Sequence, residues 1–179
     1  MRERVQRKMI IETARLRLVP LTLPYVTSAP DDRDALARET GTEVPASWPP
    51  ELWDQDAQDW TRRMLEHDSA TDWIPRCIVL REPRPVACGV IGIAAPDADG
   101  RVLIGYGVLP EFRRRGYAAE ALGCIVAWAF GDPRVRVVFG DTYPHLIASI
   151  RTMERNGFRY VGAGTEEGTV RYELHPPSS

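Results

Sequence analysis

The sequence lacks the cysteine patterns of a metal-binding protein or of a small disulfide-stabilised domain. Its 3 cysteines, Cys77, Cys88 and Cys124, have neither metal-ligand nor redox spacing, and their odd number argues against a disulfide framework. All of them stand in apolar stretches typical of strands or helices. We therefore expect reduced core cysteines, a cytoplasmic location and no metal site.

Long apolar runs are also missing. No uninterrupted apolar stretch approaches the roughly 18 residues that a transmembrane helix needs, so we expect no membrane partner. Residues 1–9 are rich in charge but lack the apolar segment of a signal peptide, and we expect them to form a flexible tail. Because the formal net charge is −2, we expect no general attraction for nucleic acid.

Two familiar nucleotide-binding loops are absent as well. A Walker loop ends in Gly-Lys followed by Ser or Thr, and no such ending occurs. The pair Gly105 and Gly107 lacks the third glycine of a dinucleotide-binding fingerprint and lies inside a predicted strand. The sequence therefore favours neither of these classes of nucleotide-binding protein.

What the sequence does contain is a strand, a basic turn and a helix in direct succession. Residues 103–108 are apolar and bounded by Gly and Pro, which is typical of a buried strand. Arg113, Arg114 and Arg115 follow, and an Ala- and Leu-rich stretch with helical spacing begins at Ala118.

This turn has the features of a diphosphate site. Gly116 lets a ligand come close to backbone N–H groups, and a helix N-terminus offers unpaired donors and a positive dipole end. The arginines add positive charge, which suits a polyphosphate. The alternative is an ordinary strand–turn–helix corner whose basic turn is solvated. The residues of the turn alone leave both interpretations open.

The pattern Arg113-x-x-Gly116-x-Ala118, preceded by Val108-x-Pro110, resembles the acetyl-CoA pyrophosphate loop of the GNAT N-acetyltransferases. A second stretch is similar to the RimJ/RimL-like branch of that family, with matches at Ala148, Ser149, Gly157 and Phe158. Residues 12–18 also resemble the first strand of that branch, so the resemblance extends over residues 10–174.

Pattern reading predicts a mixed α/β domain. The expected strands are 16–21, 74–80, 86–94, 101–108, 135–142, 158–161 and 169–174, and the expected helices are 32–39, 51–67, one from 118 and one over 147–155. The resemblance implies the arrangement: a single GNAT domain over 10–175, with a mixed, mostly antiparallel central sheet and helices on both faces.

The resemblance also implies acetyl-CoA, or coenzyme A, as the cosubstrate. The backbone of Val108 would hold the pantetheine arm and polarise the thioester, whereas its side chain reads as an ordinary core valine. The other residues implied to bind the cosubstrate are Arg113, Arg114, Arg115, Gly116, Tyr117, Ala118, Ala119 and Ser149.

The catalytic base is less well marked. Many RimJ/RimL-like sequences carry Glu where this chain has Leu103. Asp141, at the end of a predicted strand, is the best remaining acid and could act directly or through water. Its alternative role is to cap the turn over 142–144.

Departures from the family pattern also affect which residue is expected to donate a proton to the leaving thiolate. Met153 stands where many members have a proton-donating Tyr, so Ser149 is the expected partner of the sulfur, with Tyr143 and Tyr117 in reserve. The alternative for Ser149 is a first-turn serine bonded to backbone. Leu146 replaces the usual Asn and cannot hydrogen-bond as Asn would.

The first half of the chain would line the acceptor site. Trp53 and Trp60 fall on one face of the predicted helix over 51–67 and are read as core residues. Trp48 and Trp73 flank loops, so we expect them to be better placed to touch an acceptor.

These observations predict an N-acetyltransferase that moves an acetyl group to a primary amine, of a protein N-terminus or a small molecule, by direct transfer in a ternary complex. A catalytically weak acyl-CoA-binding or regulatory protein is the alternative, motivated by Leu103, Leu146 and Met153. A third hypothesis, a nucleic-acid-binding domain using the arginines, predicts binding with a steep salt dependence. The acceptor, and the choice between monomer and homodimer, stay open.

Overall fold

Apolar and β-branched segments form an eight-stranded sheet in the computed structural model, which describes residues 8–177. The strands are β1 (Ile11–Glu12), β2 (Leu16–Pro20), β3 (Arg76–Leu80), β4 (Val86–Ile93), β5 (Arg101–Val108), β6 (Val137–Thr142), β7 (Arg159–Ala163) and β8 (Val170–Leu174). Their order is β1-β2-β3-β4-β5-β6-β8-β7. Only β5 and β6 pair in parallel among the described strands, which confirms a mixed, mostly antiparallel sheet.

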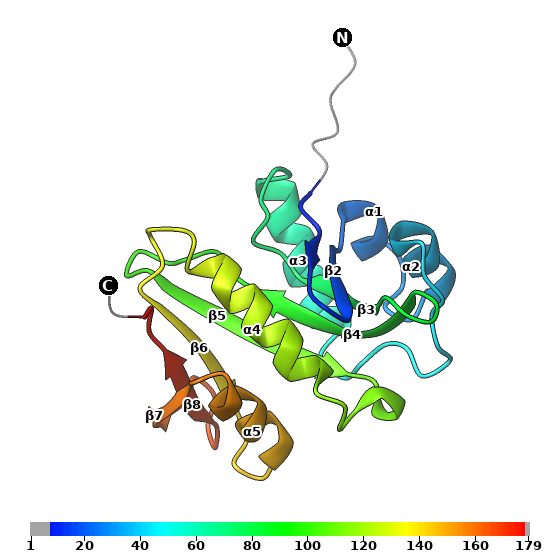
Figure 1. Ribbon diagram of the computed structural model, residues 1–179. Helices are drawn as coiled ribbons and strands as arrows, with labels where there is room; N and C mark the ends of the chain where they lie inside the picture. Colours follow the sequence, from blue (N-terminus) through cyan, green and yellow to red (C-terminus); the bar gives the residue numbers. More distant parts are fainter. Residues whose placement is uncertain (1–7, 178–179) are drawn as a thin grey trace.

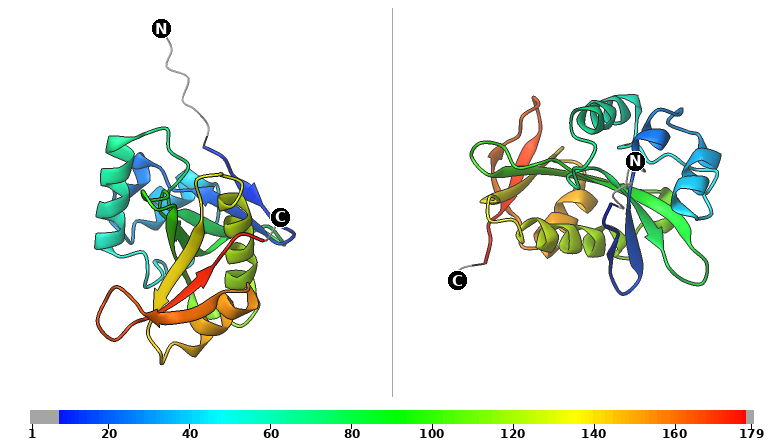
Figure 2. Two further views of the ribbon diagram at one scale, coloured as in Figure 1. Left: turned by 90° about the vertical axis from the view of Figure 1, so that its left-hand side faces the viewer. Right: turned by 90° about the horizontal axis from the view of Figure 1, so that it is seen from above.

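Helices cover both faces of this sheet, as predicted (Figures 1 and 2). On one face lie α1 (Leu23–Val26), α2 (Arg33–Thr40) and α3 (Gln55–His67); on the other lie α4 (Tyr117–Ala129) and α5 (Ile147–Arg155). A short 3-10 helix, η1 (Pro110–Phe112), joins β5 to the turn before α4.

The side chains of β3 point alternately to the two faces of the sheet and contribute to the apolar core on both. Ile78 and Leu80 pack in the cluster that contains α4, whereas Cys77 and Val79 pack in the cluster beneath α1 and α3. Successive side chains of a strand point to opposite faces, so one strand supplies both layers. The sheet is therefore covered by apolar packing on each side.

The parallel pair β5 and β6 diverges. Only Arg101 to Leu103 pair with Val137 to Phe139; beyond them β5 continues against β4 and β6 against β8. Helix α5 follows β6 directly and lies on the α4 face of the sheet. The two strands thus open toward the segment that leads into α5.

Helix α3 begins later than the sequence pattern predicts. Asp54 caps it by accepting from the Ala57 N–H, so Trp53 lies outside the helical register. The buried face of the helix is Gln58, Thr61 and Leu65. Trp60 is 38% exposed, so the prediction that it is a core residue was wrong.

The position of Trp48 also differs from expectation. Its side chain is only 4% exposed, and its Nε1 donates to the Tyr25 hydroxyl at 3.1 Å. Trp53 donates to the same hydroxyl at 3.1 Å and stacks on the Tyr25 ring. Because Trp48 is committed to this buried network, it belongs to the core and not to an acceptor surface.

The N-terminal segment is anchored from Lys8 onward. The Lys8 ammonium donates to the Thr71 carbonyl, and the Met9 N–H donates to Asp72. Residues 1–7 of the predicted tail lie outside the described residues.

All three cysteines are free: Cys77 and Cys88 are buried and Cys124 is partly buried, in agreement with reduced core cysteines. Within residues 8–177, no helix combines the length and apolar character needed to cross a bilayer. In the same residues, no group of three or more acidic, histidine or cysteine side chains is arranged to hold a metal ion.

Candidate active site

The turn between η1 and α4 is shaped as a cradle of backbone donors. Arg114 has φ 64° and Gly116 has φ 81°, so two residues of this turn adopt the left-handed conformation. In the hydrogen bonds made within the described chain, the N–H groups of residues 114–119 have no acceptor. Left-handed residues in a turn point successive N–H groups toward a common centre, which is an arrangement that binds anions.

The first turn of α4 strengthens this cradle. Gly116 is its N-cap and has no side chain to satisfy the first N–H groups, which leaves the positive end of the helix dipole exposed. The side chains of Arg113, Arg114 and Arg115 are exposed around the turn. The donor set therefore fits a diphosphate, and the sequence prediction of strand, basic turn and helix is confirmed.

A fourth arginine reaches this turn from the first strand hairpin. Arg15 donates from Nη1 to the Arg115 carbonyl at 2.9 Å, and its guanidinium lies 4.7 Å from the centre of the Tyr117 ring. A methyl group added to Gly116 would lie 3.3 Å from the Arg15 Nη2. Sequence analysis missed Arg15, because a contact across so much of the chain leaves no local pattern.

Glu120 holds Arg15 in place. It accepts from the Arg15 Nε at 2.6 Å, from the Arg15 N–H at 3.0 Å and from the Thr13 hydroxyl at 2.6 Å. Burial by itself raises the pKa of Glu120, but the hydrogen bonds from Thr13 and Arg15 outweigh it, and the pKa lies below its usual value. Glu120 is thus an ionised anchor for Arg15.

The turn is also tied to the end of β5. Arg113 donates from Nε to the Val108 carbonyl at 2.9 Å, and the Val108 side chain is buried in the core, as predicted for that side chain. The structure thus brings Val108 and the residues of the turn together. Ser149 lies elsewhere, in the first turn of α5.

Ser149 faces a residue that the sequence analysis did not single out. The Tyr106 hydroxyl donates to the Ser149 carbonyl at 2.9 Å and lies 3.4 Å from its Oγ. Tyr106 is on β5, beyond the last residue that pairs with β6. The contact therefore crosses the opening between the diverging strands. Burial raises the pKa of Tyr106 above its usual value, so the phenol stays protonated.

Asp141 is occupied by neighbours at the far side of the opening. Its carboxylate accepts from the Arg171 Nε and Nη2, both at 2.8 Å, and from the Thr165 N–H at 2.8 Å. These partners differ from the turn cap proposed as the alternative. The hydrogen bonds from Arg171 lower the pKa of Asp141, which makes the carboxylate a weaker proton acceptor. Its role as the base stays a prediction beside this second, structural role.

The three departures from the family pattern are now placed. Leu103, at the last paired position of β5, is 46% exposed, and Leu146 is the N-cap of α5 with a 45% exposed side chain. Met153 is buried against Gly140 of β6. The first two leave apolar side chains where the resemblance implies polar ones, and the third has no hydroxyl to offer.

The opposite face of β5 is covered by the loop before α3. Methyl groups added to Gly105 and Gly107 would lie 3.6 and 3.3 Å from the Leu52 side chain. The Tyr25 network with Trp48 and Trp53 fixes this loop. Leu52 therefore forms the wall beside the opening on the side away from α4.

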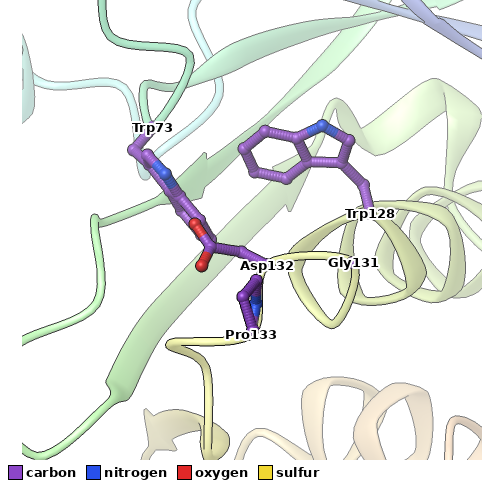
Figure 3. A pocket seen from close by; sticks show the side chains of 5 residues that line it. All are labelled: Trp73, Trp128, Gly131, Asp132 and Pro133. Atoms are coloured by element: carbon purple, nitrogen blue, oxygen red, sulfur yellow. The ribbon is translucent and has the colours of Figure 1, made fainter.

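Trp73 lies far from this region. It packs on Trp128 at 4.6 Å between ring centres, and both border a shallow hollow of about 480 Å³ together with Asp132 (Figure 3). The hollow is at the C-terminal end of α4, and the 13 residues of that helix separate it from Gly116 by roughly 18 Å. Trp73 therefore lies beside this hollow and away from the turn, and its contact with an acceptor stays a prediction.

A model of the acetyltransferase (GNAT) domain matches residues 15–159. The chain belongs to the GNAT acetyltransferase family. Bacillus subtilis (strain 168) YjdG, described as an uncharacterized N-acetyltransferase, is 26% identical over 150 residues, which are 83% of this chain and 89% of YjdG. Membership implies transfer of an acetyl group from acetyl-CoA.

Solved structures agree on the fold. An acetyltransferase from Agrobacterium tumefaciens str. C58 superposes with a TM-score of 0.66 at 23% identity, over 98% of this chain and 100% of that one. A ribosomal-protein-S5-alanine acetyltransferase from Vibrio fischeri gives a TM-score of 0.66 at 12% identity, over 93% and 96% of the two chains. At these identities the likeness supports the GNAT fold and not a shared acceptor.

Proposed function

We propose that this GNAT acetyltransferase binds the diphosphate of acetyl-CoA on the N–H groups of residues 114–119 and transfers the acetyl group to a primary amine. The observation that carries the proposal is the set of unpaired N–H groups at an uncapped helix N-terminus. The exposed arginines of the turn and Arg15 supply positive charge for the phosphates. An anion is the ligand that such a donor set stabilises best.

The transfer proceeds directly between two bound substrates. The thioester supplies the activated acetyl group, and the opening between β5 and β6 admits its arm. The backbone at Val108 and the hydroxyl of Ser149 act on the carbonyl and the sulfur. Because the protein holds both substrates together, much of the entropic barrier to acetyl transfer is removed. This positioning is the main contribution of the protein to the reaction rate.

Proton removal from the acceptor is assigned to water near Asp141, the acid at the end of β6. Asp141 keeps its Arg171 partner in this arrangement, so it orients the water and does not itself need a high pKa. Leu103 offers no carboxylate at the position where relatives often have one.

The acceptor class follows the RimJ/RimL-like resemblance. The Vibrio fischeri neighbour is named for acetylating an alanine of ribosomal protein S5, and its fold matches this one. We propose a protein N-terminus or a small primary amine as the acceptor. The apolar wall of Leu52 and Leu103 beside the opening suits an amine carried on a small apolar group.

Coenzyme A binding tests the first half of this proposal. Gly116→Asp adds a carboxylate in the cradle, and Gly41→Asp is its matched control, since Gly41 also has a positive φ and nothing within 4 Å of an added methyl group. By calorimetry, we expect Gly116→Asp to weaken coenzyme A binding at least 30-fold, equivalent to about 2 kcal/mol. Equal affinities in the two variants would overturn the placement.

Release of free thiol with a panel of amines and N-terminal peptides tests the second half. Turnover with any of them supports the transferase. Tight binding of coenzyme A with no turnover would favour the alternative, a weakly catalytic acyl-CoA-binding protein. The reasons for that alternative are the apolar residues Leu103 and Leu146 and the buried Met153.

A further inference from the structure

The contact between Tyr106 and Ser149 is a hydrogen bond from β5 to the first turn of α5, beside apolar packing of the two elements. Beyond Leu103, β5 has no ladder to β6, and α5 begins only after β6 has ended. The Tyr106 hydroxyl donates to the Ser149 carbonyl at 2.9 Å across this gap. A partly buried phenol that donates to a helix carbonyl restricts where the first turn of that helix can lie.

The same contact leaves the Ser149 hydroxyl available. Its Oγ lies 3.4 Å from the Tyr106 Oη, at the long end of hydrogen-bond distance, and has no shorter partner among the described residues. Thr152, one turn along, is committed, because its hydroxyl donates to the Ala148 carbonyl at 2.9 Å. Ser149 is therefore the hydroxyl on this face of α5 that can still donate to a ligand.

The causes that shift the pKa of Tyr106 are burial and neighbouring hydroxyl groups. Burial raises the pKa of Tyr106, and hydrogen bonds with Ser149 and Thr152 only partly offset it; no Coulombic contribution arises from the part of the chain that is described. Met153 presents a thioether from α5 and has no proton to give. The side chains that can donate to a negative charge here are therefore hydroxyl groups.

We infer that Tyr106 is the positioning residue that aims the Ser149 hydroxyl at the sulfur of coenzyme A, and that the pair stabilises the leaving thiolate. The inference rests on the proposed function. When the carbon–nitrogen bond forms and the carbon–sulfur bond breaks, the electron pair of the latter moves to sulfur. Ser149 donates a hydrogen bond to that thiolate, and water protonates the thiolate after it leaves.

The thiol of bound coenzyme A reports this interaction without any acceptor. A thiolate absorbs more strongly than a thiol in the far ultraviolet, so a pH titration of the complex, with the titration of the free protein subtracted, gives the pKa of the bound thiol. A hydrogen bond to the thiolate lowers that pKa below the value in free coenzyme A. We expect Tyr106→Phe and Ser149→Ala each to raise it by about one unit, and the double variant to add little more.

Tyr160→Phe is the matched control, because Tyr160 is an exposed tyrosine on the edge strand β7. It should leave the pKa of the bound thiol unchanged. Calorimetry should show coenzyme A affinity within threefold of wild type in Tyr106→Phe and Tyr160→Phe, which separates positioning from binding. Ser149→Ala keeps the backbone contact to Tyr106, so it serves as the second test where Tyr106→Phe folds poorly.

Three outcomes would overturn the inference. A bound thiol with the same pKa as free coenzyme A would show that no donor reaches the sulfur. The same lowered pKa in wild type and both single variants would assign the effect to other groups. Absence of coenzyme A binding in the wild type would remove the proposed function itself, and the inference with it, and calorimetry distinguishes that case from the first two.

Discussion

Arg15 and Glu120 lie 105 positions apart in the sequence, and their side chains meet at 2.6 Å beside the first turn of α4. The pair is partly exposed, so its direct contribution to folding stability is small. Its consequence is positional: the same guanidinium donates to the Arg115 carbonyl and lies against Tyr117. The first strand hairpin thereby supplies a cation to a turn that is far away along the chain.

Replacing Arg15 should weaken coenzyme A binding more than it weakens the fold. We expect Arg15→Ala to raise the dissociation constant roughly tenfold, equivalent to about 1.4 kcal/mol, because the turn loses both a positive charge and a support for the Arg115 carbonyl. Calorimetry at moderate salt measures it. Arg17→Ala, which removes the same charge from a looser pair with Glu12, is the control. Equal losses in the two variants would mean that only net charge matters.

Leu146→Asn should stabilise the protein. Leu146 is the N-cap of α5 and has no side-chain cap hydrogen bond, whereas Asn is among the best N-cap residues. We expect a gain of about 1 kcal/mol in the free energy of unfolding, measured by urea denaturation. Leu146→Ala, which removes the exposed leucine without adding a cap, should not reproduce the gain. A loss of stability in the Asn variant would show that the leucine itself packs usefully.

Asp141→Asn should reduce stability in a pH-dependent way. Arg171 lowers the pKa of Asp141 in the folded state below its unfolded value of about 3.9, so the ion pair contributes stability above that pH. The contribution is lost as the pH falls through the folded-state pKa. We expect a deficit of about 1–2 kcal/mol at pH 7 that shrinks toward pH 3.

The same variant separates the two roles of Asp141. Denaturation curves at pH 7 and pH 3, with the exposed Asp31→Asn as control, measure the structural role. Turnover of the folded variant measures the catalytic one. A hundredfold fall in kcat with an unchanged KM would establish Asp141 in proton removal. A deficit in stability that does not shrink in acid would contradict the ion-pair account.

Arg76→Met should leave the protein as stable or more stable. The Arg76 side chain is fully buried, and its Nε and Nη2 have no hydrogen-bond partner within the described residues. Burial lowers the pKa of its guanidinium to about 10, so the folded state disfavours the charge. The Arg76 guanidinium is stabilised by one hydrogen bond to the Ile74 carbonyl, by the Trp128 ring centre at 4.9 Å and by the charge of Asp72.

Thermal and urea denaturation measure this effect. We expect an increase of about 1 kcal/mol, because an apolar side chain of similar length removes the desolvation cost of an unpaired buried cation. Arg84→Met, at an exposed turn, controls for the loss of charge. A fall in stability of several kcal/mol would show that the contacts of Arg76 with Ile74 and Trp128 outweigh its desolvation.

Some elements could be predicted from the sequence because their causes are local. The apolar strand that ends at Val108, the basic turn and the helix that follows are determined by the types of neighbouring residues, which set the backbone conformation, the charge of the turn and the start of the helix. The meander of β3, β4 and β5 is marked by turns rich in Gly and Pro.

Elsewhere the local pattern led to errors. Counting from Trp53 placed Trp60 on the buried face, but Asp54 starts the helix after Trp53 and rotates that face to Thr61 and Leu65. Trp48 flanks a loop and was expected to be placed to touch an acceptor, yet its indole donates to the Tyr25 hydroxyl inside the core. A helix that starts one residue later, or a hydrogen bond to a distant residue, changes which side chains are buried. The spacing of apolar residues in the sequence reveals neither effect.

The sequence by itself determined the family, the position of the turn that we propose binds the diphosphate and the residue types around it, since these depend on neighbours along the chain. Tertiary structure alone decided that Arg15 joins the turn, that Arg171 engages Asp141 and that Tyr106 meets Ser149. Each of these contacts closes a long stretch of chain. Their geometry comes from the packing of the sheet and helices and the divergence of β5 from β6, which no short segment encodes.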